Sequence, residues 1–258
     1  MQELSTLGYI IIFSFIGSLL SLLIAAGMLI HKKVAYRLSH YLISFAAGTL
    51  LGAVFFDLLP EALHEGEERG IDIFLWTLIG VLFFFLLERC IHWFHHHQEE
   101  NKERVKPTVA LIILGDGVHN FIDGVVIATT FLINIPLGII TTFAIAAHEI
   151  PQEIGDFGIL LHEGLSRKKA LILNMLSAAT AMVGAVITFF LGTKLEGVLP
   201  IMLSLTAGFF IYIALSDLVP HIHERSHTHK NRWLIFVETG ILLLGVITIW
   251  IAVTLLEH

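Results

Sequence analysis

Long apolar stretches dominate this sequence and restrict the chain to a membrane fold. A transmembrane helix needs about 20 predominantly apolar residues. Hydrophobic residues make up 56% of the 258 residues and charged residues only 14%, and the mean hydropathy of +0.83 lies outside the range of soluble domains. Eight stretches of spanning length cover residues 7–30, 41–63, 71–93, 108–133, 136–163, 170–191, 198–221 and 233–256. We therefore predict an all-α integral membrane protein with a single transmembrane domain over residues 1–258.

The basic residues predict how the chain is threaded through the membrane. All but Arg69 and Lys194 of the 15 Lys and Arg residues lie just before or in the connections that follow the first, third, fifth and seventh stretches. Because cytoplasmic loops carry the positive excess, these connections are predicted to face the cytoplasm. Both termini then lie outside, in a plasma or inner membrane, and a His-containing loop over residues 94–107 lies in the cytoplasm. The first stretch is interpreted as a retained helix, since no Lys or Arg precedes it.

A repeated pattern relates the second and seventh stretches. Ala47-Gly48 precedes Asp57 and Pro60 with the same spacings by which Ala207-Gly208 precedes Asp217 and Pro220. The predicted threading runs the two stretches in opposite directions. This pattern is typical of inverted repeats in secondary transporters. We predict that helices 1–3 and 6–8 form two related halves around helices 4 and 5, in a 3+2+3 arrangement.

Two polar strings, residues 119–124 and 148–156, interrupt the fourth and fifth stretches near their middle. Ionisable side chains at membrane depth cost energy unless they face a bundle interior or an ion path, so these strings indicate a functional site. Residues four apart share a helical face. The spacing therefore predicts one site from His119, Asp123, His148 and Gln152, and an adjacent site from Asn120, Glu149 and Glu153.

The residue types of these strings favour a divalent transition metal. No Lys or Arg lies near the middle of any of the eight stretches, so the carboxylates have no basic partner there. Imidazole with carboxylate suits Zn²⁺ better than Na⁺ or K⁺. Zn²⁺ is the predicted cargo, and Fe²⁺, Mn²⁺ and Cd²⁺ stay open. A polar trail of Asp116, Asp156, His162 and Glu163 leads toward the predicted cytoplasmic side as an exit path.

With these strings in place, the chain resembles the ZIP family of divalent metal transporters over essentially its whole length. The string His119-Asn120-x-x-Asp123-Gly124 is similar to the family's fourth-helix motif, and residues 148–156 resemble the HEXPHEXGD signature of one large branch. The resemblance implies a binuclear site between helices 4 and 5, movement of metal into the cytosol, and a homodimer. Gln152 departs from the signature, which has a second His at this position.

Other functions fit the sequence less well. His148-Glu149 begins like the protease motif H-E-x-x-H, but Gln152 replaces its second His, which argues against an intramembrane zinc metalloprotease. A metal sensor or receptor without flux is the other alternative, and the trail of polar residues through both leaflets favours transport over it. No Gly-rich phosphate loop is present, and no nucleic-acid partner is expected. The chain is predicted not to be an enzyme.

Overall fold

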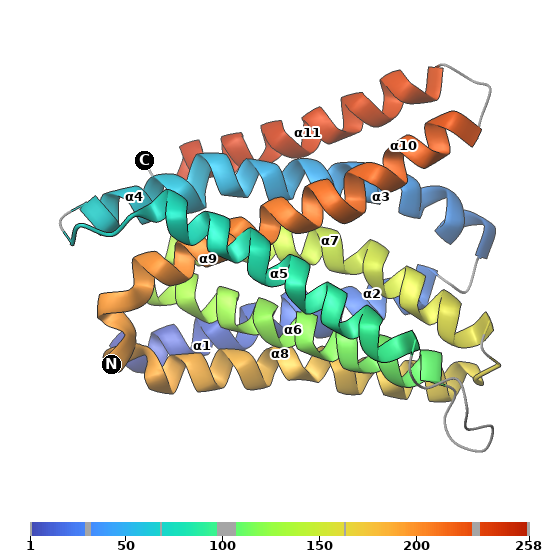
Figure 1. Ribbon diagram of the computed structural model, residues 1–258, viewed down its shortest axis with the longest axis horizontal. Coiled ribbons are helices and arrows are strands. Elements are labelled where there is room, and N and C mark those ends of the chain that lie inside the picture. Colours follow the sequence, from blue (N-terminus) through green and yellow to red (C-terminus); the bar gives the residue numbers. More distant parts are fainter. Residues whose placement is uncertain are drawn as a thin grey trace.

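The protein forms a bundle of long helices (Figure 1). The computed structural model describes residues 2–28, 32–67, 69–96, 107–162, 164–228 and 233–256, and every regular element in these ranges is helical. The elements are α1 (Gln2–Ser14), η1 (Phe15–Leu20), α2 (Ser21–Met28), α3 (Lys32–Ala53), η3 (Val54–Leu58), α4 (Leu59–Glu67), α5 (Ile73–His96), α6 (Pro107–Ile133), α7 (Ile135–His162), α8 (Arg167–Leu195), η4 (Glu196–Val198), α9 (Leu199–Tyr212), η5 (Ile213–Leu218), α10 (Val219–Thr228) and α11 (Trp233–Leu256).

Each predicted stretch falls on a helical run, which confirms the all-α class, although α3 begins nine residues before the second stretch and α10 ends seven residues after the seventh. Six runs in the described part of the chain are long and apolar enough to cross a membrane, namely Ser5–Gly27, Tyr41–Glu67, Ile73–Cys90, Arg167–Gly192, Leu199–His223 and Trp233–Leu255. The two other long helices, α6 and α7, contain the polar strings, which lower their hydropathy. That these two also cross the membrane remains a prediction.

The segments with the repeated sequence pattern also match in local structure. Asp57 lies in η3 and Asp217 lies in η5, and both of these short elements are π-helical. Each is followed directly by a helix with proline at its second position, Pro60 in α4 and Pro220 in α10. Single-turn π-helical segments within α-helices occur frequently at functional sites.

Glycines bring the backbones of two helix pairs close together outside the polar strings. A side chain at Gly48 of α3 would meet the backbone of Leu242 in α11, and one at Gly245 of α11 would meet the backbone of Phe45. A side chain at Gly208 of α9 would likewise meet the backbone of Thr77 in α5. Small residues at such crossings allow membrane helices to pack closely. The pairs α3 with α11 and α5 with α9 are therefore tightly joined.

The helices α6 and α7 form an antiparallel hairpin in the middle of the bundle, joined at Asn134. In Figure 1 α8 runs along α6, and the marked N and C termini lie at the same end of the bundle. We call residues 124–147 the turn half of this hairpin, and residues 107–123 with 148–162 its polar half. The turn half belongs to the main hydrophobic core, while a smaller cluster of Val109, Phe157, Leu160 and Ala170 lies in and beside the polar half.

Candidate metal centre

Four side chains converge where the two halves of the hairpin meet. His119 and Asp123 lie one turn apart on α6, and His148 and Glu149 are adjacent on α7. Each offers one ligand atom, and these four atoms all lie within 4.8 Å of one another. The His119 side chain is 12% exposed, and the other three are 4% exposed or less. The hairpin thus places two imidazoles and two carboxylates in a buried cluster, which we call the metal cluster.

The distances within the metal cluster fit a small tetrahedral ion. Nε2 of His119 lies 3.2 Å from Nε2 of His148, 3.7 Å from Oδ2 of Asp123 and 3.6 Å from Oε1 of Glu149. Nε2 of His148 lies 3.4 Å from Oδ2 of Asp123 and 3.9 Å from Oε1 of Glu149. Zinc bonds of about 2.0–2.2 Å in tetrahedral geometry separate ligand atoms by about 3.3–3.6 Å. Only small side-chain movements would bring all four atoms to bonding distance.

Hydrogen bonding leaves the ligand atoms of this cluster available. Nδ1 of His148 lies 3.2 Å from the carbonyl oxygen of Ala144. A proton on Nδ1 donated to that carbonyl leaves the lone pair of Nε2 directed at the cluster. Oδ2 of Asp123 and both carboxylate oxygens of Glu149 are buried without a hydrogen-bond partner among the described residues. Because buried carboxylate oxygens are costly unless compensated, they indicate a place for a cation.

Aromatic rings enclose the two imidazoles. The ring of Phe84 in α5 lies edge-on to His119, with centroids 5.8 Å apart. The ring of Phe210 in α9 lies 6.2 Å from that of His148. Such apolar surroundings reduce local screening and strengthen the attraction between a divalent cation and the carboxylates.

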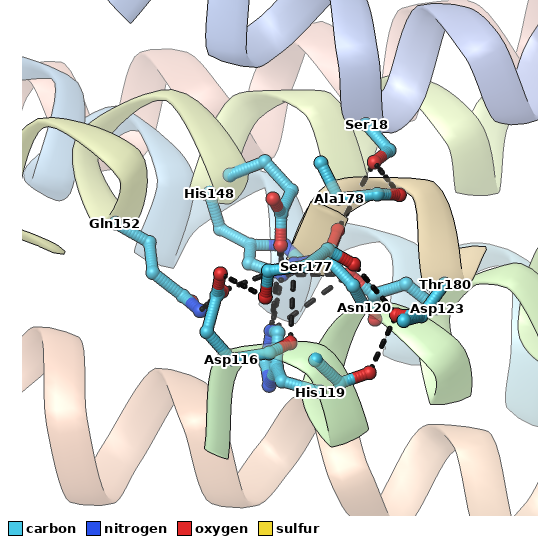
Figure 2. Close-up of polar contacts among 12 residues, drawn as sticks. Ser18, Asp116, His119, Asn120, Asp123, His148, Gln152, Ser177, Ala178 and Thr180 are labelled. Carbon is cyan, nitrogen blue, oxygen red and sulfur yellow. Dashed lines mark hydrogen bonds and ion pairs between the residues drawn. The ribbon is translucent and has the colours of Figure 1, made fainter. Parts of the chain in front are cut away.

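The structure groups one predicted ligand, Glu149, differently from the sequence prediction. Glu149, which was predicted to belong to the adjacent site, is the fourth member of the metal cluster. The amide nitrogen of Gln152 lies 3.3 Å from Oδ1 of Asp116, and a ligand role for its amide oxygen stays a prediction. Figure 2 shows the Gln152 side chain directed toward Asp116. A carboxylate is a strong acceptor for an amide N–H, which accounts for this contact.

The amide nitrogen of Asn120 bonds within its own helix, whereas Glu153 bonds to a neighbouring helix. The Asn120 amide nitrogen donates to the backbone oxygen and to Oδ1 of Asp116, at 3.2 and 3.0 Å. Oε2 of Glu153 accepts a bond of 3.0 Å from Asn174 in α8, and its Oε1 has no hydrogen-bond partner among the described residues. Both side chains are fully buried. The adjacent site of Asn120, Glu149 and Glu153 stays a prediction.

Several residues around the cluster were not recognised from the sequence. Ser18 in η1 donates toward Oδ1 of Asn120 at 3.0 Å and the carbonyl of Ala178 at 2.6 Å. Thr180 in α8 donates to the carbonyl of Gly117 at 2.6 Å. Ser14, Ser18 and Ser21 are all nearly completely buried, and their spacing of four and three residues along one apolar helix could have indicated a buried polar face.

The predicted exit residues are partly described. Asp116 is buried and lies in the polar half, one turn from Asn120. Asp156 lies on α7 beyond Glu153 and is half-buried. The side chain of His162 and the whole of Glu163 lie outside the described residues, as do residues 97–106 of the predicted His-containing loop.

Comparison with known proteins places the chain in a family. Residues 4–109 and 95–252 match the family described as ZIP Zinc transporter. The chain belongs to the ZIP zinc transporter family. With its apolar helical runs, this membership identifies a multi-pass membrane protein.

Individual relatives in the family cover most of the chain. Zinc transporter ZIP6 of Homo sapiens is 37% identical over 171 residues, which is 65% of this chain and 22% of ZIP6. ZIP4 of Rattus norvegicus is 31% identical over 291 residues, 85% of this chain and 44% of ZIP4. ZIP13 of Pongo abelii is 33% identical over 226 residues, 81% of this chain and 67% of ZIP13. The chain thus spans less than half the length of ZIP6 and ZIP4. Their names agree with the prediction of a metal transporter, not an enzyme.

Proposed function

We propose that this ZIP-family protein carries divalent transition metal ions, with Zn²⁺ as the principal cargo, across a membrane into the cytosol. The observation that carries the proposal is the metal cluster of His119, Asp123, His148 and Glu149. Residues 107–162 contain no Lys or Arg, so neither helix of the hairpin supplies a basic partner for these carboxylates. A divalent ion bound by nitrogen and oxygen ligands would suit the mixed His and carboxylate ligands and would neutralise the carboxylates. The zinc transporters among its relatives support zinc as the cargo.

The proposed direction follows from the charge distribution. The connections rich in Lys and Arg are assigned to the cytoplasm, so the end with the α6–α7 turn faces outside. The ion would reach the metal cluster near the middle of the membrane and leave through the polar half, past Asp156. The packed turn half would then close the route toward the outside.

The proposed inverted repeat gives a basis for alternating access. If α3 corresponds to α9 and α5 to α11, the tight pair α3 with α11 is equivalent to the pair α5 with α9. Both pairs make close contacts at glycine, and η3 matches η5. These equivalences support a 3+2+3 arrangement in which related halves move relative to α6 and α7. The homodimer implied by the family stays a prediction.

Zinc uptake into proteoliposomes tests the proposal. The wild-type protein should accumulate radioactive Zn²⁺ along its gradient, and Asp123→Ala should lower the initial rate at least about 100-fold, because a charged ligand is removed. Protein-free liposomes measure the background leak of zinc, and thermal unfolding checks that the Asp123→Ala variant is folded. Zinc binding without any uptake by the wild-type protein would favour a sensor and refute transport. Equal uptake by both proteins would refute the site.

A further inference from the structure

Asp116 lies beside the metal cluster but is held by a separate set of contacts. Its Oδ1 accepts hydrogen bonds from Asn120, at 3.0 Å, and Gln152, at 3.3 Å. Its Oδ2 accepts a bond of 2.5 Å from Ser177 of α8. Asp116 is 5% exposed. Figure 2 shows Gln152 and Ser177 reaching the carboxylate from different sides.

These donors belong to three different helices. Asn120 is on α6 with Asp116 itself, Gln152 is on α7, and Ser177 is on α8. Outside the metal cluster, the Gln152 bond is the side-chain hydrogen bond that joins α6 to α7 among the residues described. The metal cluster requires His119 of α6 and His148 of α7 to meet at 3.2 Å. The rotation of α6 relative to α7 therefore sets the distance between the two His ligands. Both α7 and α8 hold α6 through Asp116.

We propose that Asp116 is a positioning residue for the metal cluster, and that Gln152 and Ser177 act on the ion only through it. This inference rests on the proposed function. A carboxylate suits the role because it accepts hydrogen bonds from several sides and donates none. Hydrogen bonds to a charged acceptor are also stronger than neutral ones. Asp116 is thus a fixed anchor in the polar half, and the exit path begins beyond it.

The same geometry gives Gln152 a role other than that of a metal ligand. At this position the family signature has His, which could bind an ion. In this chain the amide nitrogen donates toward Asp116, which holds the side chain on that carboxylate. Gln152 therefore stabilises the helix pair that carries the ligands. Its loss should weaken zinc affinity by misplacing His119 and His148.

A matched pair of α8 variants separates this role from general packing. Ser177→Ala removes the bond to Asp116 and a longer contact of 3.4 Å to the carbonyl of Ile113. Thr180→Val removes a hydroxyl that also joins α8 to α6, through the carbonyl of Gly117. In proteoliposome zinc uptake, Ser177→Ala should raise KM about 3- to 10-fold with a smaller change in kcat. Thr180→Val should leave KM within about 2-fold of wild type. Thermal unfolding in detergent checks that both variants are folded and how much stability each loses.

A double-variant cycle tests whether Gln152 and Ser177 act through one group. They bond to different oxygens of Asp116. If both act through this carboxylate, Gln152→Leu combined with Ser177→Ala should raise the zinc KM by less than the product of the single changes. Gln152→Leu combined with Thr180→Val should give the product.

The outcomes are distinguishable from a failure of the transport proposal. A wild-type protein that moves no zinc refutes the proposed function. Wild-type uptake with equal KM values for Ser177→Ala and Thr180→Val would show a packing role only and overturn the inference. If the KM of the double variant Gln152→Leu with Ser177→Ala rises by the full product of the two single changes, Gln152 acts independently of Asp116. This result would also overturn the inference.

Discussion

The two halves of the α6–α7 hairpin use buried polar side chains in opposite ways. In the turn half, Thr129, Thr130 and Thr142 each donate to a backbone carbonyl of their own helix. In the polar half, Gln152 bonds to another helix, and Asp116 and Glu153 accept bonds from other helices. A hydroxyl that donates to a carbonyl of its own helix needs no partner from another helix, so the helix can pack against apolar neighbours. A bond between helices fixes their relative position, which a shared ion site requires.

The apolar neighbours show the same contrast. The buried core of the turn half consists of Val126, Ile127, Ala128, Phe131, Leu137, Ile140, Ala144 and Ile145. The metal cluster lies at the boundary, where this packing ends and buried acids begin. On the proposed orientation, the outer route is closed by packing and the inner route is lined by polar groups. Burial alone thus does not mark a functional residue.

The largest expected difference between the halves concerns transport. His148→Ala removes a ligand of the metal cluster and should reduce the rate of zinc uptake at least about 100-fold. Thr142→Val, less than two turns away in the turn half, keeps the side-chain shape and removes a bond within its own helix, so uptake should stay within about 2-fold. Proteoliposome flux measures both. A comparable loss in Thr142→Val would remove the distinction between the halves.

Two glycines that lie in the polar strings should differ in stability. A methyl group at Gly124 would meet the backbone of Ala181 in α8, whereas one at Gly155 would meet nothing within 4 Å. Gly124→Ala should therefore lower the free energy of unfolding by at least about 1–3 kcal/mol, and Gly155→Ala should be neutral or slightly stabilising. Thermal unfolding in detergent compares them. Equal melting temperatures would contradict the close contact of α6 and α8.

Two glutamates one turn apart on α7 should affect zinc affinity unequally. Glu149 belongs to the metal cluster, and Glu153 instead accepts a bond from Asn174. Glu149→Gln should raise the KM for zinc about 10-fold by removing a charged ligand. Glu153→Gln should raise it about 3-fold or less. The reverse order in an uptake titration would transfer the ligand role to Glu153.

The smallest expected effect lies at the tip of the turn half. Oδ1 of Asn134 accepts a bond of 2.8 Å from the backbone nitrogen of Leu137 at the start of α7, and its amide nitrogen donates to Glu61 of α4 at 3.0 Å. Asn134→Ala should destabilise the protein by about 1 kcal/mol through loss of the cap. Asn134→Ser can still cap α7 but is too short to reach Glu61. Chemical unfolding should therefore show that it recovers part of the lost stability. No recovery would assign the whole effect to Glu61.

The sequence predicts the helices better than it predicts the site. Apolar length and breaks at loops locate each helix, because a spanning helix needs a long apolar stretch. The spacing of four also predicts correctly that His119 and Asp123 share a face. Contacts between helices distant in the chain do not follow from such spacing. Glu149, which the spacing assigned to the adjacent site, belongs to the metal cluster, and Ser18 reaches Asn120 from a helix about 100 residues away.

Locating the ion directly tests the central claim, that the hairpin holds the cargo between α6 and α7. Anomalous X-ray scattering at the zinc edge, from crystals of zinc-loaded protein, gives the position of the ion. The expected result is a peak about 2.0–2.2 Å from Nε2 of His119, Nε2 of His148, Oδ2 of Asp123 and Oε1 of Glu149. A peak elsewhere in the bundle, with no zinc among these four side chains, would contradict the account.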